Sequence, residues 1–172
     1  MQMIDLTYVT DAVLIGAGAT LVMDLVALVR RHVWGIPALD YALVGRWALA
    51  MRQGQFVHRT ILATPPARGE IPLGWALHYL IGIGFAAVLL ELLGTGWRDL
   101  SVIDLLWPAL LTGVASVLAP YLILQPGFGF GIAAAHTPKP ALARWRSLVA
   151  HLSFGLGLFL TALIWRLLRP DM

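Results

Sequence analysis

The chain has 172 residues, of which 59% are hydrophobic and only 12% are charged, and its mean hydropathy is +0.81. The charged fraction is about half that of a typical soluble protein, so composition excludes an ordinary water-soluble globular domain. The absence of cysteine excludes disulfides and thiolate metal ligands, and the net charge of +3 comes from basic residues gathered in two loops, which favours membrane orientation over nucleic-acid binding.

Long apolar runs predict an all-α polytopic membrane protein with four transmembrane helices in a single domain, residues 1–172. Each run is close to the 20 or so residues that a helix needs to cross a bilayer, and tryptophans fall near the predicted ends, where indole rings prefer the headgroup level. The third run is expected to end where Gln125-Pro126 breaks the helix. The predicted spans are 7–29, 73–93, 103–124 and 145–165.

The basic residues predict the orientation of the spans. Nine of the 12 lie in the loops that precede spans two and four, and three lie on the other side. By the positive-inside rule the two basic loops are cytoplasmic, and both termini are periplasmic. The nine are Arg30, Arg31, Arg46, Arg52, Arg59, Arg68, Lys139, Arg144 and Arg146, and the three are Arg98, Arg166 and Arg169.

The first basic loop contains a predicted short helix over residues 37–53, with Asp40 in its first turn. Its apolar residues lie near one face, so it is expected to be an interfacial helix on the bilayer or to pack against the bundle. The sequence leaves both alternatives open.

Spans two and four share a pattern that predicts an internal repeat. His78 is followed by Gly82 and Gly84, and His151 by Gly155 and Gly157, each as H-x-x-x-G-x-G near the start of its span. The four spans would then form two parallel helical-hairpin repeats related by an axis along the membrane normal. The glycines favour either close helix packing or room for a flat ligand such as haem.

A set of motifs spread over nearly the whole chain resembles one known family. The motifs run from Gly16-Ala-Gly-Ala-Thr-Leu-Val-Met-Asp24 through Gly35-Ile-Pro, His78-Tyr79 and Gln125-Pro126 to the glycine-rich stretch after His151. They resemble the bacterial inner-membrane family catalogued as domain of unknown function 2938. The resemblance implies a four-span protein of the bacterial inner membrane, and because that family has no established activity it supplies no catalytic residue.

Three ionisable residues at membrane depth form the predicted polar centre: Asp24, His78 and His151. A carboxylate inside a span costs about 2.5–3.5 kcal/mol on insertion scales, so it needs a partner or a function. We expect the three side chains to converge near the cytoplasmic side of the bundle. The supporting residues are Thr20, Gln125, Gly82 and Gly155.

Three classes of function fit such a centre. The first is handling or transport of a proton, metal ion or small solute, and the second is a b-type haem or metal redox protein with His78 and His151 as ligands. The third is a structural or assembly subunit in which the polar residues only pair helices. No nucleotide or catalytic-triad motif favours an enzyme. The small enclosed volume of four spans favours a homo-oligomer or a membrane partner.

Overall fold

A computed structural model of the chain describes residues 6–169, which form helices and turns with no strand in that range. Four of the helical stretches are long and apolar enough to cross a membrane, as predicted, so the protein is an all-α polytopic membrane protein. The elements are α1 (Leu6–Trp34), α2 (Tyr41–Met51), η1 (Ile61–Ala63), α3 (Glu70–Leu93), η2 (Trp97–Asp99), α4 (Val102–Ser116), η3 (Pro120–Leu124), α5 (Gln125–Gly127), η4 (Ile132–Ala134) and α6 (Pro140–Leu168).

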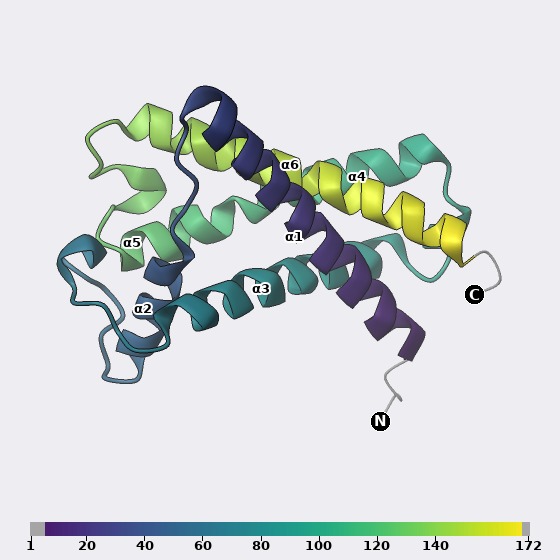
Figure 1. Cartoon of the computed structure of the whole chain (residues 1–172). Helices are drawn as coiled ribbons and strands as arrows, with labels where there is room; N and C mark the ends of the chain where they lie inside the picture. Colours follow the sequence, from purple (N-terminus) through teal and green to yellow (C-terminus); the bar gives the residue numbers. More distant parts are fainter. Residues whose placement is uncertain (1–5, 170–172) are drawn as a thin grey trace.

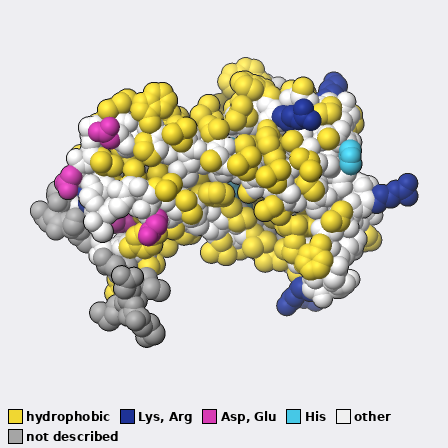
Figure 2. Space-filling model, turned by 180° about the vertical axis from the view of Figure 1, so that it is seen from behind, with side chains coloured by type: hydrophobic (Ala, Val, Ile, Leu, Met, Phe, Trp, Pro, Cys, Tyr) yellow, Lys and Arg dark blue, Asp and Glu magenta, His cyan; other side chains and the backbone are white. Residues whose placement is uncertain are grey.

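The two ends of the bundle differ. Both chain ends lie at one end, called the terminal end here, and α2 and α5 lie at the other, called the capped end (Figure 1). Helix α1 packs against α3 and α6, and α4 packs against α6, while α3 and α4 meet over a short stretch. In Figure 2 apolar side chains cover the broad middle, basic ones gather over the capped end, and acidic ones lie near the terminal end. This distribution is typical of a membrane-spanning bundle.

Glycines bring the long helices into close contact. A Cβ atom added to Gly16 would lie 2.5 Å from the Cα of Ile83, and one added to Gly82 would overlap the Thr20 hydroxyl. On the other side of the bundle, a Cβ atom on Gly155 would lie 3.1 Å from the Cα of Gly113. The surfaces beside Gly82 and Gly155 are therefore covered by α1 and α4, which supports close packing and leaves no room for a flat ligand.

The third span ends close to the predicted position. Its helical path covers Val102–Gly127, so it ends at Gly127, directly after Gln125-Pro126 and three residues after the predicted bound of 124. Its regular part ends at Ser116, and the π-helical turn η3 follows, in which the Gln125 N–H donates to the carbonyl of Pro120, five residues back. Prolines lack an N–H, and this wider turn carries the helix between the two prolines without ending it.

Two leucines of α3, Leu90 and Leu92, lie in opposite environments. Leu90 is 3% exposed and belongs to the main apolar core, whereas Leu92 is 74% exposed. Hydropathy alone could not separate the two, because leucine suits both lipid and a protein core.

The predicted loop helix packs against the bundle. It begins at Tyr41, with Asp40 as its N-cap accepting a hydrogen bond from the Ala42 N–H, so the helix is shorter than the predicted range 37–53. Added Cβ atoms on Gly45 and Gly74 would overlap the backbone of the facing helix, so α2 and α3 touch backbone to backbone. This contact positions α2 across the capped end.

Candidate functional site

Asp24 lies in α1 close to the capped end, and three side chains surround its carboxylate. The Nε2 of His78 lies 3.0 Å from Oδ1, the Tyr79 hydroxyl donates to Oδ2 over 3.2 Å, and the Tyr41 hydroxyl makes a long contact of 3.4 Å with Oδ1. The side chains of Asp24 and His78 are only 17% and 12% exposed. Asp24 and His78 are therefore paired, and the two tyrosines complete the set of donors.

Aromatic rings cover this pair on the side of α2. The Tyr41 ring stacks on the His78 imidazole with centroids 3.9 Å apart and an angle of 22° between the planes. Trp75 lies one turn before His78 on α3, with its ring centroid 4.7 Å from that of Tyr41. Burial and the nearby Asp24 charge raise the pKa of Tyr41, so its hydroxyl stays protonated and remains a donor.

The second imidazole of the predicted centre has a different partner. The Nδ1 of His151 lies 2.6 Å from the Ser116 hydroxyl, which itself donates to the carbonyl of Gly113. Because a hydroxyl has one proton to give, His151 must donate from Nδ1, and its Nε2 carries the lone pair. Within residues 6–169, no hydrogen bond or ion pair joins His151 to Asp24 or His78. The two histidines are thus held by different helices, His78 by α1 and His151 by α4.

The supporting residues divide into two groups. Thr20 donates to the carbonyl of Gly16 and lies against Gly82. It therefore belongs to the contact between α1 and α3, one helical turn before Asp24 on α1. Gln125 contacts α6 instead, where its Nε2 lies 3.4 Å from the Ser147 hydroxyl, and its Oε1 is buried without a partner among the described residues. Gln125 is therefore not brought to the Asp24 carboxylate.

An ion pair fixes the capped end beside this centre. Arg46 of α2 binds Glu70 through two parallel hydrogen bonds of 2.8 and 2.9 Å and also donates to the carbonyl of Thr64. The hydrogen bond to Glu70 raises the pKa of Arg46 further, so the guanidinium stays charged. The pair holds α2 and the following loop to the first turn of α3.

A second carboxylate cluster lies at the terminal end, and the sequence reasoning missed it. Asp11 is 2% exposed and accepts hydrogen bonds from Arg98 at 2.6 Å, from the Trp165 indole at 2.7 Å and from the Trp97 indole at 3.3 Å. The sequence offered one indication: Asp11 lies near a predicted span end, and Trp97 and Trp165 lie near predicted span ends on the same side of the membrane. The cluster ties α1 to η2 and α6.

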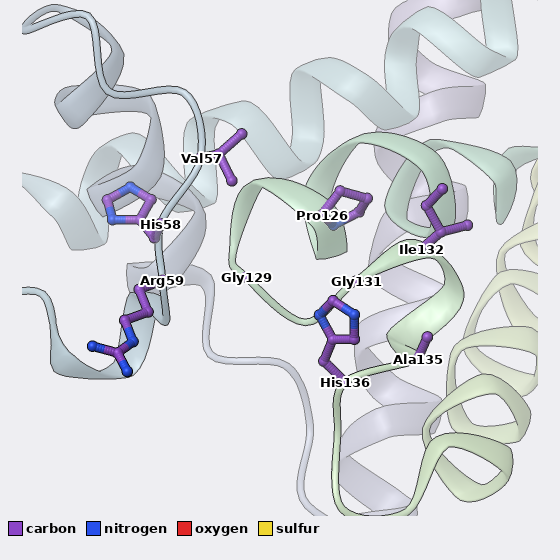
Figure 3. A pocket seen from close by; sticks show the side chains of 9 residues that line it. All are labelled: Val57, His58, Arg59, Pro126, Gly129, Gly131, Ile132, Ala135 and His136. Atoms are coloured by element: carbon purple, nitrogen blue, oxygen red, sulfur yellow. The ribbon is translucent and has the colours of Figure 1, made fainter.

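A surface pocket of about 520 Å³ lies at the capped end between segments 57–59 and 126–136 (Figure 3). In Figure 3 the His136 ring stands over Gly131, while the His58 ring and the Arg59 side chain point away from Gly129. Gly129 has a φ of +83°, and an added Cβ there would meet the carbonyl oxygen of His58 at 2.5 Å. The pocket is walled largely by backbone.

The described residues do not form a recognisable metal site. Within residues 6–169, no three His, Asp or Glu side chains lie together as a set of metal ligands. His78 directs its Nε2 to Asp24, which leaves only Nδ1 for any other ligand. The site is better suited to hydrogen bonding and proton exchange than to holding a metal ion.

Comparison with known proteins identifies a family and nothing more specific. A family model described as "Protein of unknown function (DUF2938)" matches residues 13–165. No curated protein matches the chain, and no solved structure matches it.

Proposed function

Since the chain belongs to DUF2938, a family whose description gives no function, we propose one from its own residues: the protein takes up and releases a proton at the Asp24–His78 pair inside the membrane. This proton exchange accompanies the passage or sensing of a small solute. The observation that carries the proposal is the 3.0 Å contact between a carboxylate and an imidazole at membrane depth. An intramembrane ionisable pair of this kind is typical of proton relays.

The pair keeps one geometry in two protonation states. When His78 is neutral, its Nε2–H donates to Asp24 and the pair carries one negative charge, which the hydroxyls of Tyr41 and Tyr79 stabilise. When His78 takes up a proton at Nδ1, the pair becomes a neutral ion pair. Within residues 6–169 this Nδ1 has no hydrogen-bond partner, so it is free to exchange the proton.

His151 extends the centre across the bundle. Its Nε2 carries a lone pair and has no hydrogen-bond partner among residues 6–169. In this proposal, a proton released from His78 passes to this second acceptor on α6 through an intervening water or solute. Ser116 holds this acceptor in one tautomer.

The proposal includes an orientation in the bacterial inner membrane, with the capped end cytoplasmic and both termini periplasmic. The nine basic residues of the two loops support it. Single cysteines placed at the exposed positions Gln53 and Thr95 of this cysteine-free chain test it. A membrane-impermeant maleimide added to intact cells should label the Thr95 position and leave the Gln53 position unlabelled. The reverse labelling pattern would show that the topology is opposite to the one proposed.

The two-hairpin repeat is also part of the proposal. The α1–α3 and α4–α6 hairpins each cross at a pair of glycines, Gly16 with Gly82 and Gly113 with Gly155, and each presents a histidine one turn from that crossing. The hairpins are not packed symmetrically, because α1 lies along α6 while α3 and α4 barely meet. A homo-oligomer or membrane partner would cover the exposed apolar faces of these outer helices.

A structural or assembly role is the second candidate, and one observation favours it. The Asp24 carboxylate has a donor on each oxygen from the protein itself, so it can be stable without any function. The haem alternative is not favoured, because Asp24 occupies the Nε2 of His78 and helices cover the glycine surfaces that would accept a flat ligand.

The decisive experiment measures proton exchange and folding in the same variants. Protein with ¹⁵N-labelled histidines is compared between pH 5 and 9 by NMR, and proton flux is measured in liposomes carrying a pH-sensitive dye under an imposed potential. We expect the His78 resonances to titrate and the wild type to carry protons. Asp24→Asn should shift that titration and reduce flux at least tenfold while folding remains intact.

Asp99→Asn is the matched control, because Asp99 is an exposed carboxylate outside the centre. It should leave both measurements unchanged. If His78 shows no titration over this range, or if Asp24→Asn lowers only the yield and thermal stability, the structural role replaces the proton-exchange proposal.

A further inference from the structure

We infer that a pocket at the start of α2 binds the headgroup of a zwitterionic phospholipid, phosphatidylethanolamine. The pocket has a volume of about 400 Å³ and lies between the end of α1 and the beginnings of α2 and α3. Its chemically distinctive lining residues are Arg31, Asp40, Tyr41 and Trp75. The inference does not depend on proton exchange at Asp24.

The pocket offers both charges of the headgroup a partner. Arg31 and Asp40 are exposed, and within residues 6–169 no ion pair or hydrogen bond joins the Arg31 guanidinium to another group. Asp40 uses Oδ1 to cap α2, which leaves Oδ2 available. Opposite charges that line one pocket without pairing with each other fit a ligand that carries both. A guanidinium suits the phosphate, and a carboxylate accepts hydrogen bonds from the ethanolamine ammonium.

The aromatic residues add to the recognition of this headgroup. The Trp75 side chain is 43% exposed, and its indole N–H has no hydrogen-bond partner among the described residues, so it can donate to a phosphate or ester oxygen. The rings of Tyr41 and Trp75 lie at 58° to each other, with centroids 4.7 Å apart. Such faces attract an alkylammonium group at short range. Tryptophan at a span end is also typical of the headgroup level.

The neighbouring surface fits the rest of the lipid. Toward the middle of the membrane from the pocket, Leu25 and Leu28 precede Arg31 on α1, and Leu80 follows Trp75 on α3. These three side chains are 51%, 50% and 61% exposed. Because both helices cross the membrane, this apolar surface faces acyl chains while the pocket faces the headgroups. This position favours a lipid over a free zwitterion from solution.

The test measures binding of short-chain lipids to the full-length protein in detergent. Dihexanoyl phosphatidylethanolamine, phosphatidylcholine and phosphatidylglycerol are titrated separately, with the midpoint of thermal unfolding and native mass spectrometry as readouts. Phosphatidylethanolamine should raise the midpoint saturably and bind about tenfold more tightly than phosphatidylglycerol, which lacks the ammonium. Soluble phosphoethanolamine should bind much more weakly than the lipid, because it lacks the acyl contacts.

Two variants assign the binding to this pocket. Arg31→Gln should weaken phosphatidylethanolamine binding about tenfold, and Asp40→Asn should remove the preference over phosphatidylglycerol. Asn caps a helix as well as Asp, so α2 should stay folded. Arg52→Gln, an exposed residue at the other end of α2, is the matched control and should bind like the wild type.

Several outcomes would overturn the assignment. Equal affinity of the wild type for phosphatidylethanolamine and phosphatidylglycerol would show that the pocket does not recognise the ammonium. Equal affinity for phosphatidylethanolamine and phosphatidylcholine would show that hydrogen bonds from the ammonium to Asp40 do not contribute to binding. Identical behaviour of Arg31→Gln and Arg52→Gln would place the lipid elsewhere, and equal binding of soluble phosphoethanolamine would identify a free metabolite as the ligand. Loss of flux in Asp24→Asn bears on none of these outcomes.

Discussion

The two carboxylates of α1 lie in chemically different clusters at opposite ends of the bundle. Asp11 accepts hydrogen bonds from Arg98 and two indoles, groups that keep their protons throughout the physiological pH range. Asp24 accepts from tyrosine hydroxyls and from His78, and an imidazole can exist either neutral or protonated. The terminal end is thus held by a permanent ion pair, while the capped end contains a pair whose charge can change. The chemical type of its hydrogen-bond donors, more than its degree of burial, distinguishes a structural carboxylate from a candidate functional one.

The largest effect is expected from breaking the permanent pair. Asp11→Asn removes the negative charge and leaves the Arg98 guanidinium largely buried without compensation, since its Nε already lacks a partner within residues 6–169. Removing one member of a buried pair typically costs about 3–5 kcal/mol. The free energy of unfolding in detergent should fall by roughly that amount, and η2 should become more accessible to protease.

Asp99→Asn provides the comparison, because Asp99 is exposed in the same segment as Arg98. Its unfolding free energy should stay within about 0.5 kcal/mol of the wild type. If Asp11→Asn were equally mild, the cluster at the terminal end would not hold the helices together, and the contrast with Asp24 would lose its basis.

The second prediction concerns the crossings that hold the two hairpins. A Cβ added to Gly113 would overlap the backbone of Gly155, whereas one added to Gly84 would meet nothing within 4 Å. Gly113→Ala should therefore cost about 1–3 kcal/mol, because backbone cannot move aside as a flexible side chain can. Gly84→Ala should be neutral or stabilising by up to about 1 kcal/mol, since alanine favours the helix. Thermal unfolding of both variants in one detergent measures the difference, and equal behaviour would remove Gly113 from the contact.

Sequence reasoning found the parts of this molecule that depend on local composition. The four spans follow from apolar runs, and Asp24 and His78 could be singled out because ionisable residues inside spans are rare. Tyr41 could not be assigned to the same centre because it lies in the loop helix, whose packing the sequence left open, and Tyr79 could not be distinguished from other aromatic residues near the start of a span. Asp11 was not identified as a buried carboxylate, because a carboxylate near a span end is usually solvated.

The sequence could not specify contacts between segments that are distant along the chain. Whether α2 lay on lipid or on the bundle depended on Gly45 meeting the backbone of α3, and glycine in a short helix carries no such signal by itself. The π-helical turn at Pro120 inside the third span could not be predicted either, because it has no sequence pattern that distinguishes it from a regular helix.

The third prediction compares the two imidazoles of the proposed centre. His151 relies on the neutral Ser116 hydroxyl where His78 relies on a carboxylate. Ser116→Ala should lower the free energy of unfolding by about 0.5–1.5 kcal/mol, the range of interhelical hydrogen bonds in membranes. Ser153→Ala removes a hydroxyl that bonds only within its own helix and should cost less. If the two variants were equal, the Ser116 hydroxyl would not be holding His151.

The smallest effect is a pH dependence confined to the capped end. His58 is 3% exposed, its Nδ1 lies 2.9 Å from the Thr64 hydroxyl, and burial lowers the pKa of the imidazole in the folded protein. The unfolded chain therefore binds a proton more readily than the folded one, so this contribution to stability is present above about pH 6.5 and is lost as the pH falls. The backbone N–H groups of His58 and Ile61, which bond to the carbonyls of Gly127 and Phe128, should exchange hydrogen a few-fold faster at pH 5.5 than at pH 7.5 after correction for intrinsic rates. His58→Gln should abolish this pH difference without affecting exchange around Asp11, whereas a difference that persisted in the variant would assign the pH dependence to the Asp24–His78 pair.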